Sequence, residues 1–308
     1  MQNEITSIYM NPVLKRVFPA IIAGVLHSIV LSSCGGNANK EGQASDTSVV
    51  NDTNIAPEAF FQVPLPGDLF LQLKEFGVKA KGNLMNPVDN ITLYTDQRLK
   101  AVNFGVYSSD LFYCSTFDQK ADVLKYFNNM KKLADELGIS SVINDETLKR
   151  IEKNLNNKDS LNRITNEIFF DASSNLENNG QGATLALVVA GGMAESIYLS
   201  TQSVGAFKAN SASIQYIADQ KYPLENLFQY LEKHAADERV ALTKNTIKPL
   251  KDAFDAIKEE ASERASVTGK KVIGGTTKLS ITEADYSKIS AIALSVRNEL
   301  TVNKSTTK

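Results

Sequence analysis

The feature that most constrains the fold is a nearly unbroken succession of helix-type patterns from residue 96 to residue 302. Apolar residues recur there at spacings of three and four, which is the period of a helix that buries one face. Patterns that are typical of strands are scarce. Because the connections are short, neighbouring helices should be mostly antiparallel. We therefore expect an all-α bundle of eight or nine helices.

Caps and breakers delimit these helices. Gly138 stands where a left-handed C-terminal cap belongs, and Pro249 should kink the helix that contains it. Thr282-x-x-Asp285 is a capping box that opens the last helix. Residues 83–95 are expected to be a connector, and residues 269–280 a loop rich in Gly, Thr and Lys. A short opening helix is expected at 68–76, and the others at 96–117, 119–137, 145–156, 160–178, 183–203, 211–221, 224–236, 237–263 and 282–302.

The N-terminal segment has the parts of a secretory signal in their usual order. Lys15 and Arg16 precede a run that is nearly all apolar from Val17 to Leu31. This run is too short for a membrane-spanning helix, which needs roughly 20 apolar residues. Met10 is an alternative start to Met1, because a short basic region normally adjoins the apolar run.

The residues Leu31-Ser32-Ser33-Cys34 form a lipobox, so the segment resembles the signal peptide of bacterial lipoproteins. The resemblance implies that residues 1–33 are removed and that Cys34 carries diacylglycerol and an acyl chain such as palmitate. Several acyl chains hold a protein stably on a membrane, at about 0.8 kcal/mol per buried CH₂. The residue at position 35 is Gly rather than the inner-membrane retention signal Asp, which implies the outer membrane, with the body facing either the periplasm or the cell surface. An ordinary secretory signal with a chance cysteine is the alternative.

A polar linker separates this signal from the body. Residues 34–59 comprise the lipidated cysteine and a small, polar, non-periodic stretch that reads as a disordered tether. Its root-mean-square reach is roughly 25–30 Å. The helical domain is expected to occupy residues 60–308.

Composition limits the possible partners. The chain has 33 Lys and Arg residues against 35 Asp and Glu residues, a net charge of −2. This balance, without a basic run, argues against a nucleic-acid partner. The chain has 2 cysteines, so lipidation of Cys34 leaves Cys114 without a disulfide partner. Cys114 lies in an apolar helical stretch and is expected to be a buried small hydrophobe.

Two stretches of the body match each other at a nearly constant offset. Residues 110–116 (DLFYCST) align with residues 195–201 (ESIYLST), and LADE at 133–136 aligns with IADQ at 217–220. The match predicts a pseudo-repeat of about 98–138 and 183–222, in which each unit is a helical hairpin; chance similarity is the alternative. Gly191 and Gly192 should let another helix approach closely.

Asp110 and Glu195 occupy equivalent positions in this repeat, each on an apolar helix face. A carboxylate there is costly unless it is paired or hydrogen-bonded. One interpretation is that the two face each other across a pseudo-two-fold axis and bind a cation or small polar ligand, with nearby tyrosines at Tyr107, Tyr113 and Tyr198. The other is that each pairs separately with a basic or tyrosine side chain and fixes helix register, with Arg150 and Arg163 as candidates.

Motifs of the common catalytic classes do not occur. The sequence contains no GxGxxG, P-loop, GxSxG, HExxH or CxxC pattern. The chain after residue 33 has one histidine, His234, with Asp237 and Glu238 three and four residues later on an expected helix. That spacing would supply half of a metal site, but a solvated helix end is the favoured interpretation. We predict no catalytic residue and no cofactor, leave a metal undecided, and regard an enzyme as the least favoured class.

The segment NFGVYSSDL at 103–111, with LADELGI at 133–139, resembles a family of helical lipoproteins of gram-negative bacteria. The resemblance covers most of the body from about residue 60. That family has no established activity, so the resemblance implies fold and location but no catalytic residues. The favoured hypothesis is a non-enzymatic scaffold or protein-interaction module of the cell envelope, with a protein partner there. The alternative is a lipoprotein that binds a small ligand or cation through Asp110 and Glu195.

Overall fold

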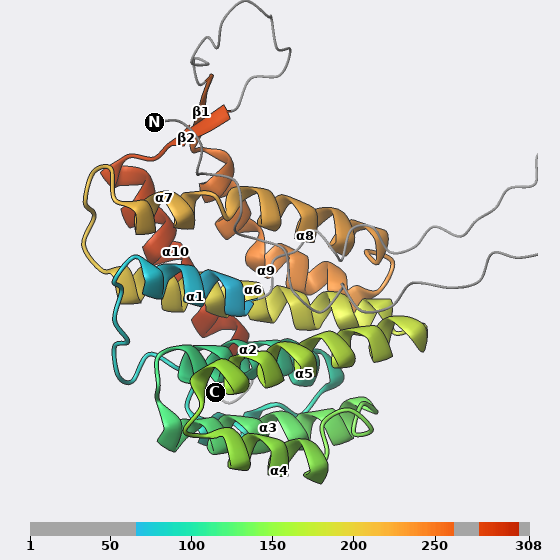
Figure 1. The fold of residues 1–308 in the computed structure, drawn as a ribbon. Coiled ribbons are helices and arrows are strands. Elements are labelled where there is room, and N and C mark those ends of the chain that lie inside the picture. The colour runs from blue at the N-terminus through green and yellow to red at the C-terminus, as the bar shows by residue number, and fades with distance from the viewer. Residues whose placement is uncertain (1–65, 262–276, 302–308) are drawn as a thin grey trace, which may run out of the picture. The chain divides into compact units, whose positions relative to one another are not determined.

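The computed structural model describes residues 66–261 and 277–301. These residues form an all-α bundle with a small two-stranded sheet, as expected (Figure 1). The predicted signal peptide and tether lie outside the described residues. The elements are α1 (Pro66–Glu75), a 3₁₀ helix η3 (Val88–Leu93), α2 (Gln97–Thr116), α3 (Lys120–Leu137), α4 (Asp145–Asn154), α5 (Lys158–Asn178), α6 (Gly182–Val204), α7 (Ala212–Ala218), α8 (Lys221–Lys233), α9 (Glu238–Asp255), β1 (Lys258–Ala261), β2 (Thr277–Ser280) and α10 (Glu283–Thr301).

Local capping explains most helix ends. The Asp96 side chain accepts a hydrogen bond from the backbone N–H of Leu99 and opens α2. Gly138 ends α3 in the left-handed conformation, with a φ of 77°, as predicted. At α10 the capping box is confirmed, because Asp285 accepts from the backbone N–H of Thr282 and Thr282 Oγ1 accepts from that of Asp285.

The region around the sheet differs from the prediction. The helix expected at 237–263 ends at Asp255, and residues 258–261 form β1 instead. β2 pairs with it antiparallel, inside the segment predicted to be a loop. The helix expected from residue 224 begins at Lys221, because proline is tolerated in the first turn of a helix. The helix expected at 211–221 is correspondingly shorter, and with the short opening helix the described residues hold ten α-helices.

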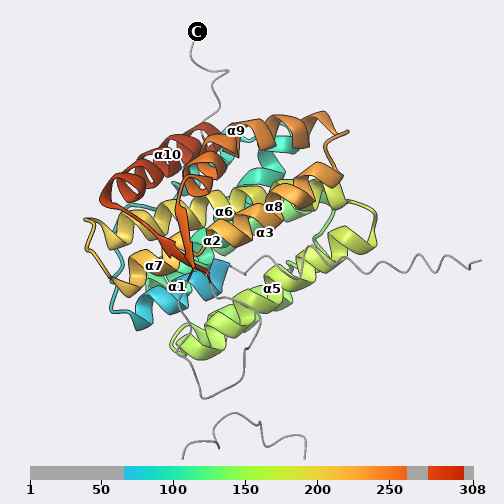
Figure 2. The same ribbon diagram turned by 90° about the horizontal axis from the view of Figure 1, so that it is seen from above.

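α2 and α6 form the centre of the bundle. Both are buried along almost their whole length, and they pack on each other more extensively than any other pair of elements. α3 and α5 contact α2, whereas α9 and α10 contact α6. Seen from above, α9 and α10 lie on one side of α6 and α5 lies on the other (Figure 2).

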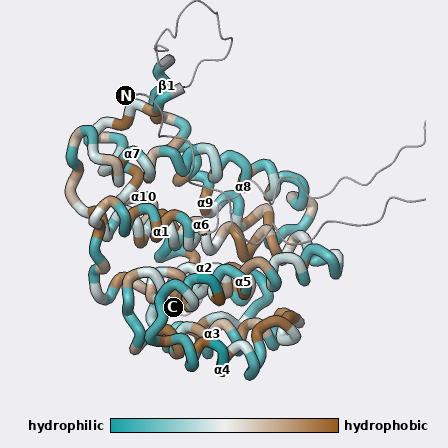
Figure 3. The backbone as a smooth tube through the Cα atoms, viewed as in Figure 1, coloured by the Kyte–Doolittle hydropathy of each residue, from teal (hydrophilic) through white to brown (hydrophobic). Residues whose placement is uncertain are grey.

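The central position of α6 accounts for its hydropathy, which is visible as a run of brown in Figure 3. Among the described residues it is the one helix with the length and hydropathy to cross a membrane. Its most apolar window is 83% buried inside the fold.

The two central helices run parallel. Gly105 lies against Val188, and four residues further along α2 the Ser109 hydroxyl donates to the carbonyl of Gly192 at 2.8 Å. Contacts on both helices thus advance in the same direction. The prediction of mostly antiparallel neighbours concerns helices joined by short connections, and α2 and α6 are far apart in the chain, so no short connection dictates their direction.

Glycines set the distance between α2 and α6. A Cβ atom on Gly105 would lie 1.9 Å from the carbonyl oxygen of Val188, and one on Gly191 would lie 2.0 Å from that of Val102. The contact is reciprocal, since each glycine touches the carbonyl three residues before the other glycine. The prediction that Gly191 admits a close helix is confirmed, and its partner is Gly105.

The pseudo-repeat extends only partly beyond this pair. α3 packs along α2 as one helix of 18 residues, which completes the first predicted hairpin. The corresponding segment after α6 is divided between α7 and α8, and both contact α6 less extensively. The reciprocal geometry therefore belongs to the central helices and not to two whole hairpins.

We predict that Gly105→Ala lowers the free energy of unfolding by about 3 kcal/mol or more, because its methyl group cannot coexist with the Val188 carbonyl. The helix propensity gained from alanine, about 1 kcal/mol, does not offset this clash. Gly82→Ala is the control, since its Cβ would meet nothing within 4 Å, and it should change stability by less than about 0.5 kcal/mol. Urea unfolding measures both, and equal stabilities would contradict the close contact.

Candidate functional site

The close approach of α2 and α6 brings Asp110 and Glu195 together. Both residues are 0% exposed, and their carboxyl groups are near enough for each to affect the pKa of the other. They occupy equivalent positions along the two parallel helices. The structure thus places the two predicted acids side by side, in a position that solvent does not reach.

Arg297 of α10 is the basic partner of this pair. Its Nε donates to Glu195 Oε2 at 3.2 Å, and its Nη2 donates to the carbonyl of Leu84 at 3.4 Å. The guanidinium group also lies over the Tyr198 ring, 5.0 Å from the centroid. One arginine therefore connects α10, α6 and the segment before η3.

The two arginines predicted as partners are elsewhere. Arg150 and Arg163 both pair with Glu167 at the protein surface. α4 and α5, which carry them, lie away from the acid pair because each has an amphipathic face that packs at the edge of the bundle. The prediction of Arg150 or Arg163 as the partner is wrong.

The charge of the cluster requires a proton. Asp110 and Glu195 would together carry two negative charges against the single positive charge of Arg297. Burial, and then the neighbouring Glu195 carboxylate, raise the pKa of Asp110 well above its usual value. Burial also raises the pKa of Glu195, although Arg297 opposes that effect. Among the described residues Glu195 Oε1 has no hydrogen-bond partner, and a proton on Asp110 would leave the cluster neutral.

The predicted connector at 83–95 forms the third wall of the site. The backbone N–H of Asn86 donates to the Asp110 carboxyl oxygens at 3.2 and 3.4 Å. The Asn86 carbonyl accepts from the Tyr126 hydroxyl at 3.0 Å, and its side-chain amide donates to the Tyr94 hydroxyl at 2.8 Å. Asn86 is itself fully buried. The connector is thus fastened to α2, α3 and its own second half at one residue.

The three tyrosines predicted near the acids have different roles. Tyr198 touches the cluster through its ring, which faces Arg297. The Tyr107 hydroxyl donates instead to the carbonyl of Pro87 at 3.1 Å, and Tyr113 shares a hydrogen bond with Ser203 at 2.8 Å. Burial raises the pKa of all three. Tyr107 and Tyr113 therefore hold neighbouring segments in place.

The sequence prediction missed Arg297, Asn86 and Tyr126. A signal for Arg297 was present, because it lies on the apolar stripe of the last helix, four residues after Ala293 and three before Leu300. A basic residue at such a position needs an acidic partner inside the fold. Asn86 carries no comparable signal, since an asparagine in a connector is ordinary.

The structure also places Cys114 and His234, the two other residues that the sequence singled out. Cys114 is buried, as predicted, and its thiol contacts the Met85 sulfur at 3.2 Å. His234 ends α8 while Asp237 caps α9, so the helix expected to carry both does not exist. Within residues 66–261 and 277–301, no group of three or more His, Cys, Asp or Glu residues is arranged to hold a metal ion.

Comparison of the chain with protein-family models, curated proteins and solved structures finds no match. The resemblance to helical lipoproteins therefore stays a prediction.

We predict that Arg297→Met lowers the free energy of unfolding by about 3–5 kcal/mol, because it leaves a buried carboxylate without its counter-charge. Arg150→Met is the matched control. It breaks the exposed pair with Glu167 and should cost less than about 1 kcal/mol. Chemical denaturation compares the two, and a similar loss in both variants would refute the assignment of Arg297.

The raised pKa of Asp110 also gives a pH dependence of known sign. The folded protein holds the Asp110 proton more tightly than the unfolded chain, whose usual value is 3.8. The corresponding stability is complete below that pH and is lost as pH rises through the folded pKa. We expect the free energy of unfolding of Asp110→Asn to rise relative to that of the wild type as pH increases from about 4.

Asp145→Asn is the control for that experiment. A hydrogen bond from Lys131 lowers the pKa of Asp145, so its contribution is lost as pH falls, and the difference from the wild type should have the opposite sign. Denaturant titrations over a pH series measure both differences. A difference for Asp110→Asn that does not vary with pH would show that no proton is held at the pair.

Proposed function

We propose that the chain is a lipid-anchored protein of the outer membrane whose helical body acts as a scaffold or interaction module. The lipobox ending at Cys34 supports the anchor, and the polar stretch after it supports a short tether. The body then works within a few tens of Å of the bilayer. In this proposal partners are bound by the outer helix faces.

The observation that carries the proposal is the complete burial of the Asp110 and Glu195 carboxyl groups beside Arg297, whose side chain is only 11% exposed. Arg297 donates to Glu195 and to the Leu84 carbonyl, and Asp110 accepts from the Asn86 backbone, so the cluster connects α2, α6, α10 and the connector. Catalytic acids and bases must reach a substrate. A cluster with no exposed carboxylate surface instead supports a rigid platform.

The alternative, a cation bound by Asp110 and Glu195, has less support. Arg297 already occupies the place of a counter-ion at Glu195, at 3.2 Å. A metal would have to displace the guanidinium group and open the connector. Thermal unfolding with and without added divalent cations tests this alternative, and a saturable increase in stability would support it.

The anchor predicts a specific pattern of labelling. Cells that express the wild-type chain and are fed an alkyne-tagged palmitate should incorporate the label and retain the protein in the outer-membrane fraction. Cys34→Ser should abolish the label and release the protein, whereas Cys114→Ser should do neither, since Cys114 is buried. Labelling of the Cys34→Ser protein would overturn the anchor.

The interaction role is tested on the outer faces. A photo-reactive amino acid placed at Leu242 of α9 or Phe170 of α5, both strongly exposed, reports contacts in intact cells. The proposal expects a discrete cross-linked product at one of these faces that disappears in the Cys34→Ser background. The same residue placed at the buried Leu250 is the control. Absence of any discrete product at exposed positions on all outer helices would overturn the interaction role.

A further inference from the structure

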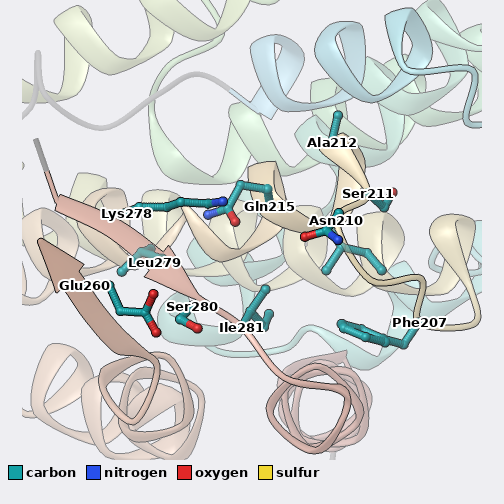
Figure 4. A pocket seen from close by; sticks show the side chains of 11 residues that line it. Phe207, Asn210, Ser211, Ala212, Gln215, Glu260, Lys278, Leu279, Ser280 and Ile281 are labelled. Carbon is teal, nitrogen blue, oxygen red and sulfur yellow. The ribbon is translucent and has the colours of Figure 1, made fainter. Parts of the chain in front are cut away.

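A separate pocket lies among three segments, which are the loop after α6, the helix α7, and the paired strands β1 and β2 (Figure 4). Its volume is about 460 Å³, within the range of roughly 300–1,000 Å³ that is usual for small-molecule sites. None of its lining residues belongs to the Asp110 cluster. The segments that form it are distant in the sequence, so the pocket is a product of the tertiary fold.

The pocket combines an apolar floor with a charged rim. Ile214 and Leu279 are almost completely buried and line it together with the half-buried Phe207. The rim carries Lys278 and Glu260, both exposed. A site of this kind takes a ligand with an apolar part and polar ends.

The two charged groups on the rim, Glu260 and Lys278, do not form an ion pair with each other. Glu260 and Lys278 are directly opposed in the strand ladder, a position that favours an ion pair. Within the described part of the chain, however, neither forms one, whereas the neighbouring Glu259 pairs with Lys221 at 2.7 Å. Figure 4 shows the Lys278 side chain extending toward Gln215 and the Glu260 carboxylate lying beside Ser280. The pocket therefore offers one positive and one negative group at separate places on its rim.

The geometry points to a binding site for a small zwitterion with an apolar side chain, of the free amino acid and dipeptide class. Lys278 would receive the ligand carboxylate, and Glu260 its ammonium group. The apolar side chain would lie on Phe207 and Ile281, the partly exposed apolar residues of the lining. This site is independent of the proposed interaction role and of the lipid anchor.

The test is calorimetric titration of the full chain with L-leucine and L-leucyl-L-leucine. Blocked forms of the dipeptide separate the two charges: the N-acetyl form lacks the ammonium group, and the amide form lacks the carboxylate. We expect saturable binding of at least one unblocked compound and weaker binding of both blocked forms. No saturable binding of either unblocked compound at millimolar concentration would overturn the proposal.

Two variants assign the charges. Lys278→Met should weaken binding of the unblocked ligand about two- to fivefold, as expected for exposed ion pairs, and should remove its preference over the amide form. Glu260→Gln should likewise weaken binding of the unblocked ligand, and it should remove the preference for that ligand over the N-acetyl form. Lys288→Met and Glu225→Gln, exposed and outside the pocket, are the matched controls. Circular dichroism checks that all four fold, and preferences that survive both rim substitutions would refute the assignment.

Discussion

The backbone contact between α2 and α6 is the constraint on which the rest of the structure depends. Gly105 and Gly191 let each helix touch a carbonyl of the other, at a separation that no side chain larger than hydrogen permits. Serines extend the contact, since the Ser109 and Ser196 hydroxyls both donate to the Gly192 carbonyl, at 2.8 and 2.7 Å. At this separation the side chains on the facing sides of the two helices must contact each other.

The buried charge cluster follows from that contact. Parallel helices this close place Asp110 and Glu195 at the same level, where two ionised carboxylates would repel in a medium of low dielectric constant. Arg297 compensates one of the two charges, and burial raises the pKa of Asp110, so a proton there would compensate the other. Arg297 attaches α10 to the pair by its hydrogen bond to Glu195, and the Asp110 carboxyl accepts a hydrogen bond from the backbone of Asn86. The polar groups thus organise elements from both ends of the described chain around the central pair, and removing any one leaves the others unsatisfied.

Much of the fold could be predicted because its signals are local. Helix periods, the Gly138 cap and the Thr282 capping box depend on residues within a few positions of each other. The strands could not be predicted, because β1 is a charged stretch that is a strand only through its pairing with β2. For the site, the repeat identified the two acids, but their basic partner lies 102 residues beyond Glu195 in the chain.

By itself the sequence determined the helical class, the order of most helices and the pair of equivalent acids, since each is a short-range pattern or an internal match. Only the tertiary structure decided that α2 and α6 run parallel, that Arg297 rather than Arg150 or Arg163 is the partner, and that Asn86 lies inside the fold. It also decided that Lys278 and Glu260 share a pocket with α7. The physical reason is that charge neutralisation and close packing are satisfied by proximity in space, and several distant residues can supply the same chemical group.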